Sequence, residues 1–299
     1  MRHRSFHLPG PAPLYCEQLL PDREPTRWLL LVHGGAMSGA CWLGTPDGRP
    51  GWAQWFVAHG FGVLVPDWPG VGRSGPAGRP VTGELVCEVL GGLLEHVGHE
   101  VVLLVHSMAG PFGYRLVQTH PERVAALVAV APGPPGNLQP EPEVLAETPD
   151  YVDIQGPYLR WRLPRTGNWW PSREFLETKL VGASRRYPRH ALDAAQAALL
   201  PIAATLLAQR QNLHGSQLRV ESQDGFAGKP VLVLTGSADT EHPREIDGGV
   251  ADWLSGLGAT VDFRFLDSPD VAGNGHMPMH EDNSDELADQ VAAWVDRLP

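Results

Sequence analysis

A serine stands between a strand-like apolar run and a helical pattern in segment 101–117, VVLLVHSMAGPFGYRLV. A serine in a sharp strand-to-helix turn presents its hydroxyl above the sheet, and small neighbours let the two elements approach closely. A nearby base would make this hydroxyl, on Ser107, a nucleophile. Val105 and Ala109 occupy the flanking positions where glycine is usual, and serine is also a common helix N-cap. The segment alone therefore leaves both interpretations open.

A glycine-rich group follows an earlier apolar run, in segment 29–39, LLLVHGGAMSG. Ester cleavage develops negative charge on the carbonyl oxygen, and backbone N–H groups preset around that oxygen stabilise it. If Ser107 occupies the turn described above, we expect the N–H groups of Gly35 and Met108 to form this oxyanion hole. Taken alone, the segment is equally a glycine-rich turn after a strand. We expect His33 to brace the loop rather than to act as acid or base.

A third loop, segment 67–74 with the sequence DWPGVGRS, follows another apolar run. Its glycines and proline suit a fixed loop beside a pocket. We expect Asp67 to cap this loop or to pair with Arg73, and we assign it no catalytic role.

The elements that must position these groups form a repeating pattern of apolar runs and amphipathic stretches. This alternation predicts a parallel sheet wrapped by helices. The runs comprise residues 28–33, 61–67, 101–106, 124–131, 231–235 and 261–266. A gap of about one hundred residues separates the last two runs from the others. The sequence therefore predicts a core of residues 1–131 and 229–299, interrupted by a mostly helical cap at 132–228.

Aromatic residues are prominent in this predicted cap, and we expect them to face a ligand cavity or to pack on the core. They are Tyr151, Tyr158, Trp161, Trp169 and Trp170.

Bulk composition excludes several classes of protein. Of the 299 residues, 42% are hydrophobic and 19% charged, which is typical of a globular protein. The net charge of −11 disfavours nucleic acids and anionic membrane surfaces as partners. We find neither a signal-peptide pattern nor a membrane-length apolar run, so we expect a cytoplasmic location. The three cysteines have no CxxC spacing and predict neither a disulfide framework nor a zinc site.

The three motifs occur along the chain in the order HGG, DxPGxGxS and xHSxxG, which resembles the α/β-hydrolase superfamily. The resemblance continues into KPVLVLTGSAD at 229–239, GNGHMPM at 273–279 and a final helix at 284–295. It implies the α/β-hydrolase fold, with a mostly parallel central sheet flanked by helices. It also implies that Ser107 is the nucleophile, Asp239 the acid and His276 the base. In these roles the histidine takes the hydroxyl proton, and the carboxylate holds its tautomer.

Within the superfamily, segments 41–74 and 273–295 are similar to a small group of bacterial carboxylesterases. The acid in that group is a glutamate directly after the strand that follows the nucleophile helix. This chain has Ala131 there, so Asp239 becomes the better candidate, with Glu241 or a residue of the cap as competitors. Analogy with related esterases implies a homodimer.

Metal and cofactor chemistry finds little support in the sequence. HMPMH places His276 and His280 four residues apart, but no glutamate lies between them and Pro278 opposes a regular helix. The chain has no GxGxxG opening a helix after a strand and no GxxxxGK[ST]. We therefore expect no metal and no organic cofactor.

The sequence predicts a serine hydrolase that cleaves a small carboxylic ester, or a lactone, through an acyl-enzyme on Ser107. The same residues would also suit a thioester, amide or carbon–carbon bond hydrolase, or a lyase. A catalytically silent binding protein on this scaffold is the alternative from another class.

Overall fold

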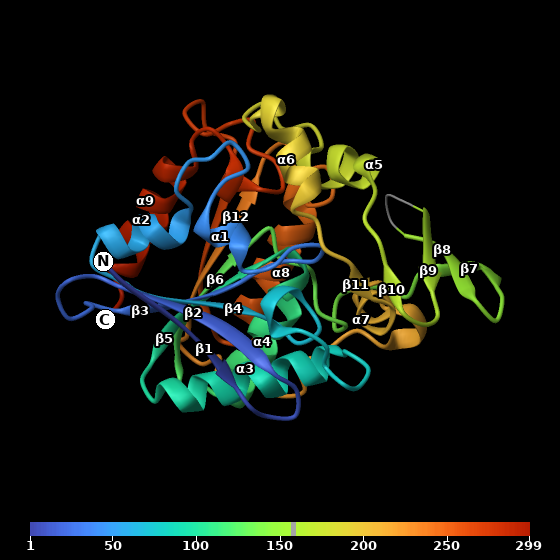
Figure 1. Cartoon of the computed structure of the whole chain (residues 1–299), viewed down its shortest axis with the longest axis horizontal. Coiled ribbons are helices and arrows are strands. Elements are labelled where there is room, and N and C mark those ends of the chain that lie inside the picture. Colours follow the sequence, from blue (N-terminus) through green and yellow to red (C-terminus); the bar gives the residue numbers. More distant parts are fainter. Residues whose placement is uncertain (157–159) are drawn as a thin grey trace.

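The computed structural model describes residues 1–156 and 160–299, so Tyr158 lies outside the described residues (Figure 1). An eight-stranded sheet forms its centre, in the order β1-β2-β4-β3-β5-β6-β12-β13. The strands are β1 Arg2–Leu8, β2 Leu14–Leu20, β3 Trp28–Val32, β4 Gly62–Asp67, β5 Val101–His106, β6 Val124–Val130, β12 Pro230–Gly236 and β13 Thr260–Leu266. The six strands from β3 onward match the predicted apolar runs and pair in parallel, which confirms the predicted fold class.

The first two strands were not predicted. β1 and β2 form an antiparallel hairpin in which Arg2 lies opposite Leu20, and β2 also pairs antiparallel with β4. All seven residues of β1 are exposed or half-buried, so this edge strand carries no apolar run that would have revealed it.

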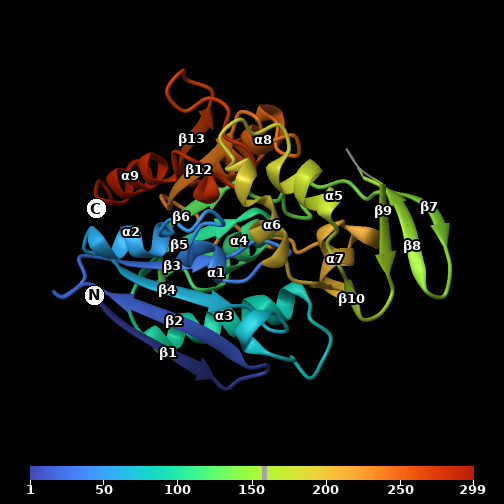
Figure 2. The same cartoon turned by 45° about the horizontal axis from the view of Figure 1, so that its top comes forward.

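Alternate side chains of the parallel strands enter two separate cores, one on each face of the sheet. Leu30 and Val32 belong to the core beneath α3, α4 and α8, whereas Leu29 and Leu31 belong to the core beneath α2 and α9. Figure 2 shows α2 and α9 on one side of the sheet and α3 on the other. The helices are α1 Ala40–Leu43, α2 Trp52–Ala58, α3 Gly83–Val97, α4 Gly110–Thr119, α8 Arg244–Gly256 and α9 Ser284–Val295. The last agrees with the helix predicted at the C-terminus.

The inserted segment between β6 and β12 contains the helices predicted for the cap, including a helical stretch at Leu176–Val181, together with short strands that were not predicted. It contains the strands β7 Glu143–Glu147, β8 Tyr151–Gln155, β9 Arg160–Pro164, β10 Asn168–Trp169 and β11 Ile202–Ala203, and the helices α5 Arg173–Phe175, α6 Leu192–Ala197 and α7 Ala204–Arg210. Val152, Ile154 and Leu163 are buried and occupy alternate positions, which suits strands rather than helices. The sheet of β7, β8 and β9 projects from the body, at the end away from both termini (Figures 1 and 2).

No helix among residues 1–156 and 160–299 is long and apolar enough to cross a membrane. Cys16, Cys41 and Cys87 are buried free thiols.

Candidate active site

Ser107 occupies a strained turn between β5 and α4. Its backbone φ is +52°, a conformation that costs a non-glycine residue about 1–3 kcal/mol and that persists only where the surroundings impose it. Val105 fits beneath the turn because its neighbour on α4 is Gly113, where an added Cβ would lie 3.0 Å from Val105 Cγ1. In this elbow the strand and the helix can approach closely because the glycine is on the helix, at Gly113, rather than at the usual strand position, which Val105 occupies.

The structure brings the three predicted triad residues together. Ser107 Oγ lies 2.8 Å from His276 Nε2, and His276 Nδ1 lies 2.7 Å from Asp239 Oδ2. The carboxylate accepts a hydrogen bond from the Nδ1–H group, which leaves Nε2 free to accept a hydrogen bond from the serine hydroxyl. All three side chains are buried, with Ser107 the most accessible at 8%. The arrangement is that of a nucleophile, a base and a group that orients the base.

The choice of acid depends on the turn after β12. Asp239 Oδ1 accepts a 3.0 Å hydrogen bond from the Glu241 amide, while the Glu241 carboxylate pairs with Lys179 instead of His276. Ala131, after β6, is buried and its amide donates to the Leu234 carbonyl at 2.8 Å. Of the two candidate acids in this turn, Asp239 is the one that contacts the histidine.

Electrostatics favour a charged Asp239 and a neutral His276. Burial alone would raise the pKa of Asp239, but its interactions with His276 and His242, including the hydrogen bond from His276, hold it well below its usual range. Burial lowers the pKa of His276 below 6.5, against the opposing effect of Asp239. The histidine is therefore unprotonated, as a base must be, at neutral pH.

His106, which sequence reasoning did not single out, holds the histidine loop. Its Nε2 donates a 2.9 Å hydrogen bond to the backbone carbonyl of His276. Burial lowers the pKa of His106 well below its usual range, so the ring is neutral. Its position directly before Ser107 is the sequence feature that could have marked His106 as part of the site.

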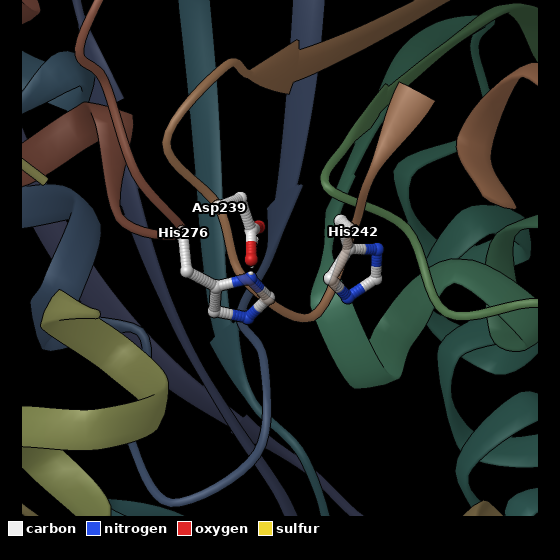
Figure 3. A group of neighbouring side chains, drawn as sticks. All are labelled: Asp239, His242 and His276. Atoms are coloured by element: carbon white, nitrogen blue, oxygen red, sulfur yellow. Dashed lines mark hydrogen bonds and ion pairs between the residues drawn. The ribbon is translucent and has the colours of Figure 1, made fainter. Parts of the chain in front are cut away.

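A second unpredicted histidine lies beside the triad (Figure 3). The His242 ring packs against the His276 ring, with centroids 4.9 Å apart, and His242 Nδ1 lies 2.9 Å from Asp247 Oδ1. Asp247 also accepts a hydrogen bond from the Thr235 hydroxyl. Burial would lower the pKa of His242, but Asp247 and Asp239 raise it above 6.5. No motif marks this residue in the sequence.

Asp239, His242 and His276 have possible metal-ligand atoms within 4.8 Å of one another. The Nδ1 atom of His276 is hydrogen-bonded to Asp239, and that of His242 to Asp247. These two histidine–carboxylate pairs explain why the three residues lie together. His280 is turned elsewhere, and its Nε2 donates to the Cys41 carbonyl at 3.0 Å. The HMPMH segment thus does not form a paired-ligand face.

The glycine-rich loop lies against the nucleophile. A Cβ on Gly34 would lie 3.1 Å from Ser107 Cβ, and one on Gly35 would lie 2.8 Å from Met108 Sδ. Ile202 of the insertion covers the same place, 3.2 Å from that Gly35 position. Gly35 and Met108 are therefore neighbours at the serine, where their predicted role in an oxyanion hole requires them to be.

The neighbouring loops have structural roles. His33 Nδ1 donates to the Gly34 carbonyl at 2.8 Å, which agrees with a bracing role. Arg73 Nε donates to Asp67 at 2.9 Å, and Asp67 also accepts from the Gly39 amide at 2.8 Å. The expected pairing of Asp67 with Arg73 is confirmed.

Two cavities between the insertion and the core flank the triad. One of about 150 Å³ is mainly apolar, and Met37 and Met277 line it beside the oxyanion loop and His276. The other, of about 270 Å³, reaches His242 and contains several charged groups.

Comparisons with known proteins agree with this geometry. The family model described as "Alpha/beta hydrolase family" matches residues 29–290. The chain is 24% identical over 343 aligned residues to a probable secreted lipase, phiG, of a fungal species (strain ATCC 74256), covering 95% of this chain and 86% of the relative. Over 112 residues it is 32% identical to the pimeloyl-[acyl-carrier protein] methyl ester esterase of Aeromonas hydrophila, covering 36% of this chain and 38% of that one.

Solved structures share the fold at low sequence identity. Carboxylesterase CesB of Bacillus subtilis superposes with a TM-score of 0.64 at 15% identity, covering 99% of this chain and 92% of that one. A structure described as a novel bacterial esterase gives a TM-score of 0.56 at 19% identity, covering 96% and 86%. Since the family model spans most of the 299 residues, the chain belongs to the alpha/beta hydrolase family.

Proposed function

We propose that this protein is a serine hydrolase that cleaves a carboxylic ester through an acyl-enzyme on Ser107. The observation that carries the proposal is the continuous hydrogen-bonded chain from Ser107 Oγ through His276 to Asp239. The relatives described as a lipase and a methyl ester esterase support ester cleavage as the reaction class.

In the first half-reaction, His276 Nε2 takes the Ser107 proton while Oγ forms a bond to the ester carbonyl carbon. Negative charge moves to the carbonyl oxygen, where the N–H groups of Gly35 and Met108 stabilise it. The bond to the alcohol oxygen then breaks, and the imidazolium returns its proton to that oxygen. Asp239 holds the ring and stabilises its transient positive charge.

In the second half-reaction, water replaces the alcohol. His276 takes a proton from water, the resulting hydroxide attacks the acyl carbon, and Ser107 leaves with the proton from the imidazolium. The products are a carboxylic acid and the free enzyme. A lactone, whose alcohol and acid are one molecule, would yield a single hydroxy acid by the same steps.

A fluorophosphonate probe tests this proposal because it reacts with an activated serine rather than with serines in general. The folded protein should acquire one adduct, which peptide mass spectrometry should place on Ser107. The heat-denatured protein and Ser107→Ala should remain unlabelled. A folded wild-type protein that neither reacts with the probe nor hydrolyses short 4-nitrophenyl esters would instead indicate the silent binding protein.

The cytoplasmic location and the homodimer stay predictions. Cell fractionation and sedimentation of the purified protein test them.

A further inference from the structure

The larger of the two cavities between the insertion and the core has a mainly apolar lining into which both parts of the chain also bring charged groups. Trp161, Lys179 and Arg210 come from the insertion, and Glu241 and His242 come from the turn that carries the catalytic acid. Its volume of about 270 Å³ would accommodate a small organic group rather than an isolated ion. One of its lining residues, His242, packs on the ring of His276, so the cavity lies next to the triad.

Arg210 connects the cavity to the nucleophile. Its guanidinium lies against Gly133, where an added Cβ would be 3.0 Å from Arg210 Nε. The Gly133 amide in turn donates a 2.8 Å hydrogen bond to the Ser107 carbonyl. Because position 133 has no side chain, the guanidinium can lie beside the backbone that supports the nucleophile.

The charges in the cavity are not fully paired. Lys179 forms an ion pair with Glu241, and Glu245 is an exposed residue at the rim. Arg210 has no carboxylate within ion-pair distance among residues 1–156 and 160–299, and its Nη1 donates to the Gln139 amide oxygen at 3.1 Å. Burial lowers the pKa of Arg210 against the opposing charges of Glu241 and Asp247, which lie beyond ion-pair distance, and an arginine remains charged at neutral pH.

An arginine has five N–H donors arranged to hold a planar carboxylate, and a half-buried guanidinium without an acidic partner is costly. We propose that Arg210 binds a carboxylate of the substrate in this cavity, so that the preferred substrates are monoesters of dicarboxylic acids. The ester carbonyl lies at Ser107 while the free carboxylate at the other end of the acyl chain pairs with Arg210. This inference rests on the proposed ester hydrolysis.

A matched pair of substrates tests the proposal. The 4-nitrophenyl monoester of pentanedioic acid and 4-nitrophenyl pentanoate have acyl chains of the same length and differ in the terminal carboxylate. We expect the wild-type protein to show the higher kcat/KM for the monoester. Arg210→Gln should lower that value by about ten- to a hundredfold, the usual effect of a charge-assisted hydrogen bond, with less than about a twofold change for the pentanoate.

Two further variants separate recognition from folding and from general charge effects. Arg210→Lys keeps the charge without the planar fork and should give an intermediate value for the monoester. Arg160→Gln removes one positive charge from an exposed position of the same insertion and should leave both substrates unaffected. An unchanged substrate preference in Arg210→Gln, or an equal loss for both substrates in a folded protein, would overturn the proposal.

The proposal that Arg210 binds a carboxylate can be tested separately from the proposal that the protein hydrolyses esters. If neither ester is cleaved, the hydrolase proposal fails, and titration calorimetry with pentanedioate still tests the cavity. Binding to the wild-type protein that is lost in Arg210→Gln supports carboxylate recognition. Equal binding by the two proteins, or no binding by either, contradicts it.

Discussion

The imidazole rings of His242 and His276 are stacked, with centroids 4.9 Å apart and planes inclined by 29°. Each ring also has its own carboxylate partner, Asp247 for His242 and Asp239 for His276. Lys179 adds a further positive charge near both rings, and the neutral His106 ring also packs against His276. The protonation of the catalytic base therefore depends on a neighbouring histidine that does not contact the serine.

We expect His242→Gln to move the acid limb of the kcat/KM profile to higher pH. Catalysis requires neutral His276, and the pKa of His276 sets that limb. Burial and the positive His242 lower this pKa below 6.5, so the wild-type limb should lie below pH 6.5. Removing the positive charge makes protonation of His276 easier and raises its pKa, by about half a unit to one unit. An unpaired Asp247 carboxylate would act in the same direction.

Kinetics with a neutral ester between pH 4.5 and 9 measure this shift. His190→Gln, at an exposed position, is the control and should keep the wild-type profile. A limb that stays in place or moves to lower pH in His242→Gln would show that His242 does not act on His276.

Asp239→Asn should lower kcat by about 10³- to 10⁴-fold, because an amide can neither hold the reactive tautomer nor stabilise the imidazolium. Glu241→Gln removes the carboxylate that pairs with Lys179 and should change kcat far less. Steady-state kinetics together with circular dichroism compare the two variants. The reverse ranking would assign the acid to Glu241.

Gly35→Ala should reduce kcat by about 10- to 1000-fold with little change in stability. The new Cβ would lie 2.8 Å from Met108 Sδ, so either the Met108 side chain or the loop that carries the Gly35 N–H must move, and loss of one oxyanion donor costs about 10²- to 10³-fold. Gly92→Ala, in α3, is the matched control because its Cβ would meet nothing within 4 Å. Equal kcat values for the two variants would refute the role of this loop.

Val105→Gly would restore the usual glycine of the elbow, yet we expect it to destabilise the protein by about 2–4 kcal/mol. The substitution removes a fully buried side chain that packs against Gly113. Adding Gly113→Ala should recover part of the loss, since the new methyl group enters the space that Val105 leaves. Urea unfolding of the single and double variants measures this coupling, and additive free energies of unfolding would argue against it.

Local sequence was sufficient for the elements and groups that depend on residues close together in the chain. The apolar runs identified β3, β4, β5, β6 and β12 because a strand covered on both faces must be continuously apolar. The edge strand β13 is half-buried, and its alternating apolar residues were enough to predict it. Chain order identified Ser107 and His276, since the turns that carry them follow recognisable strands. β1 and the strands of the insertion were not predicted because exposed or half-buried strands have a weaker apolar pattern. β2 is mostly buried, but Glu17 and Gln18 interrupt its apolar run.

Only the tertiary structure decided the partners of these groups. Asp239 and Glu241 are two residues apart and chemically similar, and the folded turn directs one carboxylate to His276 and the other to Lys179. Arg210 of the insertion lies against Gly133 and lines the cavity beside His242, through contacts that no local motif encodes. The sequence by itself therefore determined the fold class and was sufficient to propose Ser107 as nucleophile and His276 as base. The acid, the second histidine and the charged cavity depended on distances between remote segments, which packing of the whole chain sets.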